Sequence, residues 1–490
     1  MPNKKFREKE VNGMKKYAKA FACVALGAVA GVSCLLAGCG GGGGGGGFGP
    51  GDSTITDEWW STTGELQKNG DEIVFNNVEL RLTTVVTGSD MPEFNTIITR
   101  FNREYLGEIG IVVSSVTEES YNSDVAKLIS NNANAPDILM THLKEYKSLA
   151  DSKLIQPFDE VLETSGIDFD LSNYASGLAQ YSSLNFTDRT FAIPVDMHSI
   201  VVLYNKELLG EHELPETNQE LLDLCAAVKA EGVATPIAAS THLNTFYRYI
   251  FCTAILQNGG EFFDANSYNA NWSSGDNLQA YKDATSSIRS LITSGAMVRQ
   301  MSESDALSSF LNDQSLFYFV APWDVQSVLN SYSGDRSNIG GTDVSGWFAL
   351  DTSKPEANYI FGDSHAFAMS KTVTDITKKA AICEFIKWFS ENVDAACDWA
   401  NAGHMSTSKL ITESSDYQAN EMVANYLSKF FPDIDDFQTM GLSPYAGQYK
   451  SYLEQLYLAL IQNDTADSDE ALIKQYETRV NDEISTINML

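Results

Sequence analysis

Short apolar runs alternate with amphipathic stretches from Val78 onward, and this alternation is the strongest structural signal in the chain. Three runs have the length and residue types of buried strands: VELRLTTVV (78–86), IGIVVSSV (109–116) and DILMTH (137–142). One apolar helical face lies between the first two runs and consists of Phe94, Ile97, Ile98 and Phe101. A second helix is expected over 121–131, with Val125, Leu128 and Ile129 facing inward. The order predicts a βαβαβ unit with a parallel sheet and right-handed crossovers.

The remainder of the chain also mixes strands and helices. Strands are predicted within FAIPVDMHSIVVLYNKELL (191–209), SLFYFVAPWDVQSVL (315–329) and FGDSHAFAMSK (361–371). A helix over 214–232 has Thr217 as a candidate N-cap, and Glu220 three residues later completes a capping box. Further helices are expected over 246–257, 277–293 and 374–390, and the chain is mostly helical from 411. The fold class predicted from this pattern is α/β.

The first residues have the pattern of an export signal. Basic residues precede a small, apolar run, AFACVALGAVAGVSCLLA (20–37), as in a secretory signal. A transmembrane anchor is the competing interpretation, because the run approaches the length that spans a bilayer. The run ends in Leu36-Ala37-Gly38-Cys39, which resembles the lipobox of bacterial lipoproteins. That resemblance implies a lipoprotein signal peptide over 1–38 and a diacylglycerol on the thiol of Cys39.

A run of glycines follows Cys39 directly. Glycine loses the most conformational entropy on ordering, so residues 39–57 are expected to be a flexible, lipid-anchored tether. Its r.m.s. reach would be roughly 20–25 Å. Residues 58–77 form an N-terminal extension before the first strong strand. In this extension, Trp59 and Trp60 are expected to plug a hydrophobic surface of the body.

Charge and cysteine content narrow the functional classes. The formal net charge of −32 argues against non-specific binding to nucleic acid or anionic lipid. After the leader, no apolar run is long enough to span a membrane. The remaining cysteines lie in apolar, helical surroundings, so buried free thiols are expected, with one disulfide as the alternative outside the cell. These cysteines are Cys225, Cys252, Cys383 and Cys397.

The order of segments resembles that of the extracellular solute-binding proteins of ABC importers, above all the carbohydrate-binding group that includes maltose-binding protein. Two further segments carry the resemblance: APDILMTHLKEYKSLADSKLIQPFDEVLE (135–163) and LQNGGEFFD (256–264). The resemblance runs from about Val78 to Ile484 and is one of pattern rather than of identity. It implies a periplasmic-binding-protein-like type II fold, in which two α/β lobes surround a central ligand cleft.

The resemblance also implies the division of the chain and its role. Lobe 1 would hold 78–195 plus 362–410, and lobe 2 would hold 199–358 plus 411–490. The protein would capture an extracellular carbohydrate between closing lobes and deliver it to the permease subunits of an ABC transporter. It would be a monomeric binding protein and not an enzyme, with no cofactor. The lipid on Cys39 would hold it at the outer face of the cell membrane, as on Gram-positive-type surfaces.

A sugar has apolar ring faces and a rim of hydroxyls, so its site needs aromatic surfaces and planar polar groups. On the segments that the resemblance places at the cleft, the candidates are Trp323, His365, His142, Asp196, Tyr121, His198, Ser364 and Gly88. Trp323 is the first choice, because it follows a predicted buried strand in a turn with Pro322. For each histidine, a hydrogen-bonded structural role is the alternative. Asp324 is left out because it could cap the next helix.

Other ligands and other functions remain open at this point. A polyamine, metal or peptide ligand would suit the same role, and a surface adhesin or hydrolase is the more distant alternative. GDSH (362–365) resembles the nucleophile block of GDSL-type hydrolases, but it lies mid-chain, and Asn401 rather than an aspartate stands three residues before His404. DANSYNANWSSGD (264–276) loosely resembles a calcium loop, yet Tyr268 stands where a ligand oxygen is needed. No catalytic set and no metal site are therefore expected.

Overall fold

The computed structural model describes residues 58–131, 134–184, 188–241, 247–462 and 467–489. The predicted signal peptide, the tether and the lipid-bearing Cys39 lie outside the described residues. Within those ranges, none of the helices is both long enough and apolar enough to cross a bilayer.

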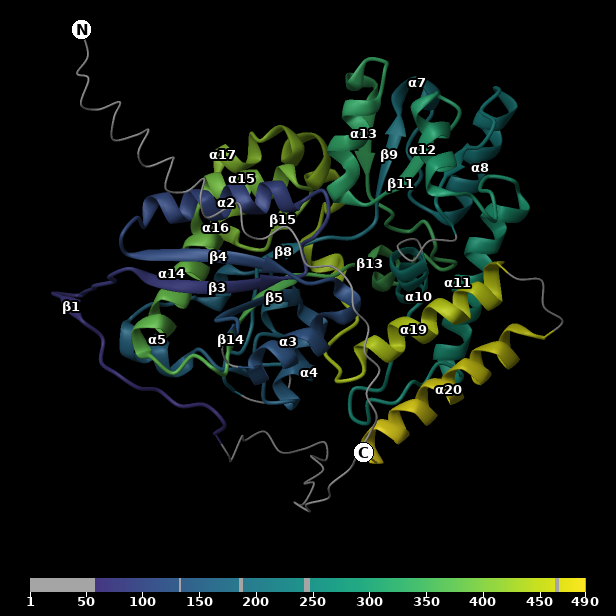
Figure 1. The fold of residues 1–490 in the computed structure, drawn as a ribbon. Coiled ribbons are helices and arrows are strands. Elements are labelled where there is room, and N and C mark those ends of the chain that lie inside the picture. Colours follow the sequence, from purple (N-terminus) through teal and green to yellow (C-terminus); the bar gives the residue numbers. More distant parts are fainter. Residues whose placement is uncertain (1–57, 132–133, 185–187, 242–246, 463–466, 490) are drawn as a thin grey trace, which may run out of the picture. The chain divides into compact units, whose positions relative to one another are not determined.

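A six-stranded sheet is built mainly from the first third of the chain (Figure 1). Its strands are β3 (Val78–Thr84), β4 (Ile109–Ser115), β5 (Ile138–His142), β6 (Ile155–Gln156), β7 (Ile193–Pro194) and β14 (His365–Ser370). The order is β4-β3-β5-β14-β6, and β7 also pairs with β14. Strand β3 runs parallel to both β4 and β5, which confirms the predicted parallel unit. Strand β14 returns from far along the sequence and runs antiparallel to β5.

The helices of this sheet follow the predicted apolar faces. They are α2 (Met91–Glu104), α3 (Tyr121–Asn131), α4 (Tyr146–Asp151), α5 (Asp159–Ser165), α6 (Ser176–Ala179), α14 (Ile376–Glu391) and α15 (Val393–Asn401). Helix α2 buries all four residues of its predicted face. Helix α3 buries Val125 and Ile129, whereas Leu128 is only half-buried. In these two helices the spacing of apolar residues in the sequence therefore agrees closely with the residues that are buried, because each helix packs one face on the sheet.

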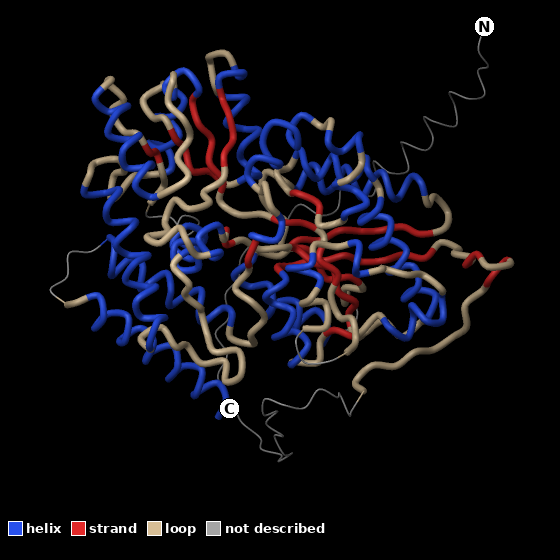
Figure 2. The backbone as a smooth tube through the Cα atoms, turned by 180° about the vertical axis from the view of Figure 1, so that it is seen from behind, coloured by secondary structure: helices blue, strands red, loops and turns tan. Residues whose placement is uncertain are grey.

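A four-stranded sheet forms a second centre of structure, and Figure 2 shows both sheets from behind. Its order is β10-β11-β9-β12, with β9 antiparallel to both of its neighbours. The strands are β9 (Val201–Asn205), β10 (Ile237–Ala238), β11 (Phe317–Val320) and β12 (Ile339–Thr342). The helices along this part of the chain are α7 (Lys206–Leu209), α8 (Asn218–Ala230), α10 (Cys252–Gln257), α11 (Gly275–Thr293), α12 (Glu303–Leu311) and α13 (Val325–Ser331). A short 3-10 turn, η5 (Pro322–Asp324), joins β11 to α13.

The C-terminal part is helical, as expected. It contains α16 (Lys409–Thr412), α17 (Ser415–Gln418), α18 (Ser428–Phe430), α19 (Ala446–Tyr457) and α20 (Asp469–Met489). Helices α19 and α20 pack against each other, and α20 also packs against α11 (Figure 1). Glu477 on α20 accepts a hydrogen bond of 2.8 Å from the hydroxyl of Ser273, which ties this end of the chain to the loop before α11.

The two sheets are linked by segments that pair with one another. Strand β8 (Asp196–Met197) pairs antiparallel with β15 (Met405–Ser406), and His198 forms an antiparallel bridge with Asp363. Strand β13 (Ile360–Phe361) pairs with β16 (Phe437–Gln438). We call residues 195–200, 361–364 and 403–408 the crossing segments. In the predicted division of the chain, lobe 1 first gives way to lobe 2 between residues 195 and 199, within the first of these segments.

Aromatic side chains complete the core at two places, the first of which the sequence analysis considered. Trp59 donates from Nε1 to the carbonyl oxygen of Ile155 at 2.7 Å, and its ring stacks on Phe191. Trp60 is 9% exposed, so this pair covers part of the body as predicted. Trp347 is fully buried and donates to the carbonyl oxygen of Pro215 at 2.8 Å. The four cysteines Cys225, Cys252, Cys383 and Cys397 are free, and all but Cys397 are buried.

Candidate functional site at the crossing segments

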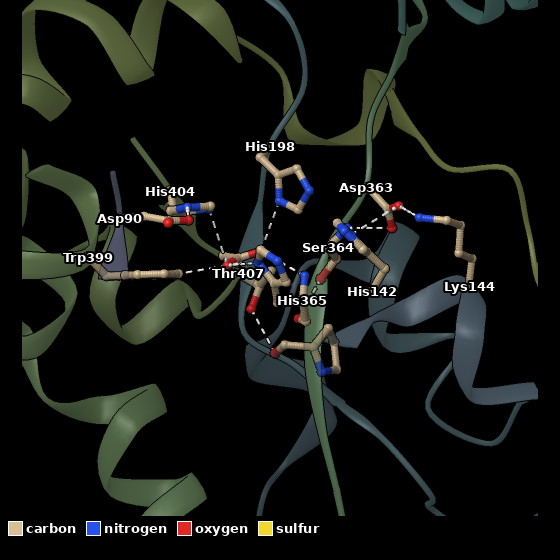
Figure 3. A network of polar contacts seen from close by, with 12 residues as sticks. Asp90, His142, Lys144, His198, Asp363, Ser364, His365, Trp399, His404 and Thr407 are labelled. Carbon is tan, nitrogen blue, oxygen red and sulfur yellow. Dashed lines mark hydrogen bonds and ion pairs between the residues drawn. The ribbon is translucent and has the colours of Figure 1, made fainter. Parts of the chain in front are cut away.

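The crossing segments and the strand ends beside them gather four of the six histidines in the chain. His142 ends β5 and His365 begins β14, and the two residues are paired across the sheet. His198 follows β8, and His404 lies between α15 and β15. Their rings lie 4.7–5.5 Å apart, centroid to centroid, in several pairs, and every one of these side chains is buried. Figure 3 shows the four residues converging from these separate elements.

Asp196 is the hub of this cluster. Its carboxylate accepts from the backbone N–H of His365 at 2.8 Å and from Trp399 Nε1 at 2.9 Å. His365 Nδ1 lies 2.8 Å from the second carboxylate oxygen, and His198 Nδ1 lies 3.3 Å from the first. Burial alone would raise the pKa of Asp196, but the charge of His365 and the hydrogen bonds from the His198 and His365 rings hold the pKa well below its usual value. The carboxylate is therefore ionised although its surroundings are buried.

A second carboxylate, Asp363, balances the other side of the cluster. It forms a close ion pair with the buried Lys144, and its Oδ2 lies 3.3 Å from His142 Nδ1. Burial raises the pKa of Asp363, but the charge of Lys144 outweighs that effect and lowers the pKa. Burial and the charge of Lys144 lower the pKa of His142, so this imidazole is neutral. The crossing segments thus hold a buried, polar and largely paired floor.

A pocket of about 410 Å³ opens beside this floor, next to η5. Its aromatic and polar lining consists of Ser240, Glu303, Tyr318, Phe319, Trp323, Asp324 and Ser327. Trp323 is shared between pocket and floor, because its ring lies 5.9 Å from that of His198 and 6.1 Å from that of His404, centroid to centroid. Burial raises the pKa of Asp324, and the nearby charge of Glu303 raises it further, although a hydrogen bond from Ser89 opposes both. The pocket therefore combines flat aromatic surface with carboxylates and hydroxyls.

Contacts between the first sheet's turn at 88–90 and η5 close one side of this region. Ser89 Oγ lies 3.3 Å from the carbonyl oxygen of Trp323 and 3.3 Å from Asp324 Oδ1. Gly403 packs directly on the backbone of Pro322 and Trp323. Asp324 does not cap α13 with its side chain, which the sequence analysis had considered. Its carboxylate instead accepts a hydrogen bond from Ser89, which belongs to the turn after β3.

The structure brings together most of the residues predicted for the site. Asp196, His198, His365 and His142 form the floor, and Trp323 lies beside them. Ser364 is buried next to His365, but its hydroxyl donates to the His365 carbonyl oxygen at 2.9 Å. That hydroxyl is therefore engaged with the backbone, rather than with a base as in a hydrolase.

Two predicted residues lie elsewhere. Tyr121 is 1% exposed in the core, and its hydroxyl donates to the carbonyl oxygen of Thr83 at 2.8 Å. The structure gives no support to a ligand contact by Tyr121, because its ring and its hydroxyl are both occupied by the protein. Gly88 lies in the turn after β3, outside the cluster, and a Cβ there would meet only the carboxylate of Asp90 at 3.4 Å. It is the next residue, Ser89, that reaches η5.

Several residues of the region escaped the sequence analysis. They are Asp90, Lys144, Ser240, Glu303, Tyr318, Asp363, Trp399 and His404. His404 was considered only as a missing hydrolase partner, yet its Nε2 lies 3.2 Å from Asp90 Oδ2. The chain has only six histidines, and several of them lie at predicted strand ends. This distribution could have indicated that they meet in the fold.

The chain matches a known protein family and resembles proteins of known structure. Residues 87–396, more than half of the chain, match the family model described as bacterial extracellular solute-binding protein. A curated relative is the sn-glycerol-3-phosphate-binding periplasmic protein UgpB of Shigella flexneri, which is 28% identical over 146 residues. That match covers 29% of this chain and 33% of the relative, so the chain spans about a third of the length of the curated relatives it matches.

Solved structures resemble the chain over nearly their whole length. The sugar-binding protein MalE of Xanthomonas citri aligns with a TM-score of 0.67 at 16% identity, covering 84% of this chain and 98% of its own. The GacH receptor of Streptomyces glaucescens aligns with a TM-score of 0.64 at 16% identity, covering 83% and 99%. These likenesses establish a periplasmic-binding-protein-like α/β fold, as predicted. The family match over more than half of the chain shows that the protein belongs to the family of bacterial extracellular solute-binding proteins.

Proposed function

We propose that this protein captures an extracellular carbohydrate in the pocket beside Trp323 and delivers it to the permease of an ABC importer. The observation that carries the proposal is the lining of that pocket. Trp323 and Tyr318 offer flat apolar faces, while Asp324, Glu303, Ser240 and Ser327 offer hydrogen-bonding groups. The hydroxyl of Ser240 is buried and has no hydrogen-bond partner among the described residues, which leaves it available to a ligand. An aromatic platform with a few polar groups matches the two faces of a sugar ring.

The neighbours in fold support the choice of ligand class. Their descriptions include a receptor in complex with acarbose, a maltose-bound protein and a sugar-binding protein. The curated relative binds sn-glycerol 3-phosphate, which is an anion. None of the residues that line the described pocket is a lysine or an arginine, and two are carboxylates. A neutral sugar suits such a pocket better than a phosphate ester, because a phosphate would meet like charge.

A cationic amine is the second candidate, and one observation favours it. Glu303 and Asp324 flank the aromatic pair Tyr318 and Trp323, and an ammonium group could use both the carboxylates and the ring faces. The same groups also accept hydrogen bonds from sugar hydroxyls. The binding experiment described below therefore decides between a sugar and a polyamine.

Closure would couple binding to transport. The contacts of Ser89 with Trp323 and Asp324, and of Gly403 with Pro322, join the two parts of the chain at the edge of the pocket. A ligand that touched both parts would favour the arrangement in which these contacts form. The permease would then recognise the closed, loaded form.

The site of action would be the outer face of the cell membrane, with the protein attached through a lipid on Cys39. The lipobox-like sequence Leu36-Ala37-Gly38-Cys39 and the glycine run after it support this step. Metabolic labelling with an alkyne fatty acid should mark the wild-type chain in its host. A Cys39→Ser variant should lose the label and leave the membrane fraction, and a variant that kept both would refute the anchor.

The ligand is tested with the full-length chain purified in detergent. Thermal unfolding is followed with maltose, maltotetraose, other oligosaccharides, sn-glycerol 3-phosphate and spermidine. We expect a saturable rise in melting temperature with an oligosaccharide, since a ligand that binds only the folded state stabilises it. A rise with spermidine alone would replace the sugar by an amine. A rise with glycerol phosphate alone would assign the ligand of the curated relative.

Trp323→Ala should weaken binding of the true ligand by about 2 kcal/mol or more, which is roughly 30-fold. Trp388→Ala is the matched control, because Trp388 is also half-buried but lies on α14, outside the pocket. Unchanged affinity in Trp323→Ala would remove this pocket from the proposal, whatever the ligand proved to be.

A further inference from the structure

Three imidazoles and one carboxylate meet inside the floor of the site. Asp196, His198, His365 and His404 each offer a ligand atom, and these atoms all lie within 4.8 Å of one another. All four side chains are buried. The Nδ1 atoms of His365, His198 and His404 face the Asp196 carboxylate at 2.8, 3.3 and 3.4 Å, respectively. The three rings thus present the same nitrogen to one carboxylate from separate chain segments.

Hydrogen bonding within the protein leaves this cluster unsatisfied. His404 Nε2 lies 3.2 Å from Asp90 Oδ2, so that nitrogen carries the proton and donates it to the carboxylate. His404 Nδ1 then holds a lone pair that points at an ionised oxygen of Asp196 only 3.4 Å away, and it makes no hydrogen bond. Two electron-rich atoms face each other in a buried place with no proton between them. A bound cation would satisfy both.

A proton is the simplest cation to consider, but the geometry does not favour one there. A protonated His404 would donate from Nδ1 to Asp196, and the contact does not meet hydrogen-bond geometry. Asp196 already accepts from the His365 backbone, the His365 ring and Trp399. His198 Nε2 is a second buried ring nitrogen in the cluster without a partner. The cluster therefore keeps two ring nitrogens, His404 Nδ1 and His198 Nε2, that no hydrogen bond from the described residues satisfies.

We propose that Asp196, His198, His365 and His404 bind a divalent transition-metal ion of the Zn²⁺ class. Neutral imidazole nitrogens together with a carboxylate oxygen are the ligands that Zn²⁺ takes in tetrahedral sites. With metal–ligand bonds of about 2.0–2.1 Å, tetrahedral ligand atoms lie roughly 3.3 Å apart. His404 Nδ1 has about this spacing from Asp196 Oδ2, and His198 Nδ1 has it from the other oxygen, Oδ1. The His365–Asp196 contact is shorter and would lengthen slightly as the ion replaced the shared proton.

The surroundings orient these residues as ligands. Metal-bound histidines usually donate their other ring N–H to a carboxylate, and His404 does so to Asp90. The ring of Trp399 stacks on that of His404 at 4.1 Å between centroids, with 6° between the planes, and its Nε1 donates to Asp196. Trp399 thus holds two of the four ligand side chains in place.

The metal would join two of the crossing segments to strand β14. Asp196 and His198 belong to the first, His365 begins β14, and His404 precedes β15. The rings of His198 and His404 also lie beside Trp323. The ion would therefore fix the floor against which the pocket is built. This role goes beyond the proposed solute binding and does not depend on which solute the pocket takes. It also departs from the sequence analysis, which expected no metal.

The test uses the full-length chain without a histidine tag, purified in detergent and stripped with a chelator. Zn²⁺ is titrated in competition with a chromophoric chelator. We expect one ion per chain, a dissociation constant of micromolar or tighter, and a zinc-dependent rise in melting temperature. His404→Gln and His198→Gln should each lower the affinity at least tenfold. His212→Gln is the matched control and should bind as the wild type does, because His212 is partly exposed on the surface beside Glu231.

X-ray absorption at the zinc edge keeps the test decisive if the buried variants fail to fold. The wild-type protein with one equivalent of zinc should show nitrogen and oxygen ligands at about 2.0–2.1 Å with imidazole scattering. Sulfur ligands at about 2.3 Å would assign the metal to cysteines and overturn the proposal. A folded wild type that binds no zinc would overturn it, as would equal affinity in the wild type and a folded His404→Gln variant. The solute screen is read separately, so failure of either proposal leaves the other standing.

Discussion

Gly403 packs against Pro322 so closely that a Cβ atom at position 403 would lie 2.2 Å from the Pro322 carbonyl carbon. Gly403 also has a φ of +91°, which L side chains rarely adopt. Gly403→Ala should therefore combine backbone strain with a clash that pushes η5 away. We expect a loss of about 2–4 kcal/mol in unfolding free energy and weaker solute binding, because the backbone of Trp323 is also within this contact. Chemical denaturation and solute titration measure the two effects.

Gly232→Ala separates strain from clash. Gly232 has a φ of +112°, and a Cβ there would meet nothing within 4 Å. The control should lose only the strain component, about 1–2 kcal/mol, and should bind solute normally. Equal stability and equal solute affinity in the two variants would show that the Gly403–Pro322 contact does not hold the pocket wall.

Asp324 should make the stability of the protein depend on pH in a definite direction. Burial raises its folded-state pKa above the ordinary 3.8, the hydrogen bond from Ser89 lowers it, and Glu303 and Asp90 raise it further, with a net rise. The charged form is therefore disfavoured in the folded state. This penalty is absent below pH 3.8, grows as the pH rises through the folded-state pKa and is complete above it. Asp324→Asn should raise the melting temperature by about 1–3 °C at pH 7 and leave it nearly unchanged near pH 3.5.

Asp482→Asn is the control for this pH effect, because Asp482 is exposed on α20. Its difference from the wild type should not vary in this way between pH 3.5 and 7. If Asp324→Asn were less stable than the wild type at pH 7, the carboxylate would be favourable in the folded state, contrary to the proposed burial penalty.

The parts of the fold that could be predicted from the sequence are those in which burial repeats along the chain. Helix α2 shows its face as Phe94, Ile97, Ile98 and Phe101, and the structure buries all four. Strand β5 begins with a continuous apolar run and is buried along its whole length, whereas β3 and β4 have buried and exposed positions along their length. In such elements each residue's environment follows from its neighbours in sequence, so local order suffices.

The contacts within the polar floor could not be predicted from the local sequence pattern. His404 and Asp90 are 314 residues apart, and Trp399 and Asp196 are 203 residues apart. Their meeting depends on how the crossing segments pair, which no local periodicity reveals. Asp196, His198 and His365 could be proposed from the resemblance to a family, whereas His404 sits in NAGHMS, a loop with no pattern of its own. The pocket residues Ser240 and Glu303 were missed for the same reason.

The role of Thr217 as a helix N-cap was predicted from local sequence alone. The structure confirms it as the N-cap of α8: its hydroxyl accepts from the backbone N–H of Glu220 at 3.2 Å. Glu220 accepts from the backbone N–H of Glu216 at 2.9 Å, one residue earlier than in the usual capping box. Thr217→Ala should cost about 1 kcal/mol of unfolding free energy, and Thr217→Ser should retain most of it. Chemical denaturation measures both, and equal losses in the two variants would show that the hydroxyl does not act as the cap.

The cysteines of the body should differ sharply in reactivity. Burial raises the pKa of Cys225 to about 12 from its ordinary 9.0, which lowers the thiolate population near pH 8 roughly a thousandfold. Burial also raises the pKa of Cys383, whereas Cys397 is half-buried and has its pKa raised by burial and by neighbouring aspartates. Iodoacetamide at pH 8, followed by peptide mass spectrometry, should modify Cys397 first and the three buried cysteines only slowly. All four should react quickly in guanidinium, which controls for reagent access. Fast native labelling of Cys225, or a mass two daltons short of four thiols, would contradict the buried free thiols of the structure.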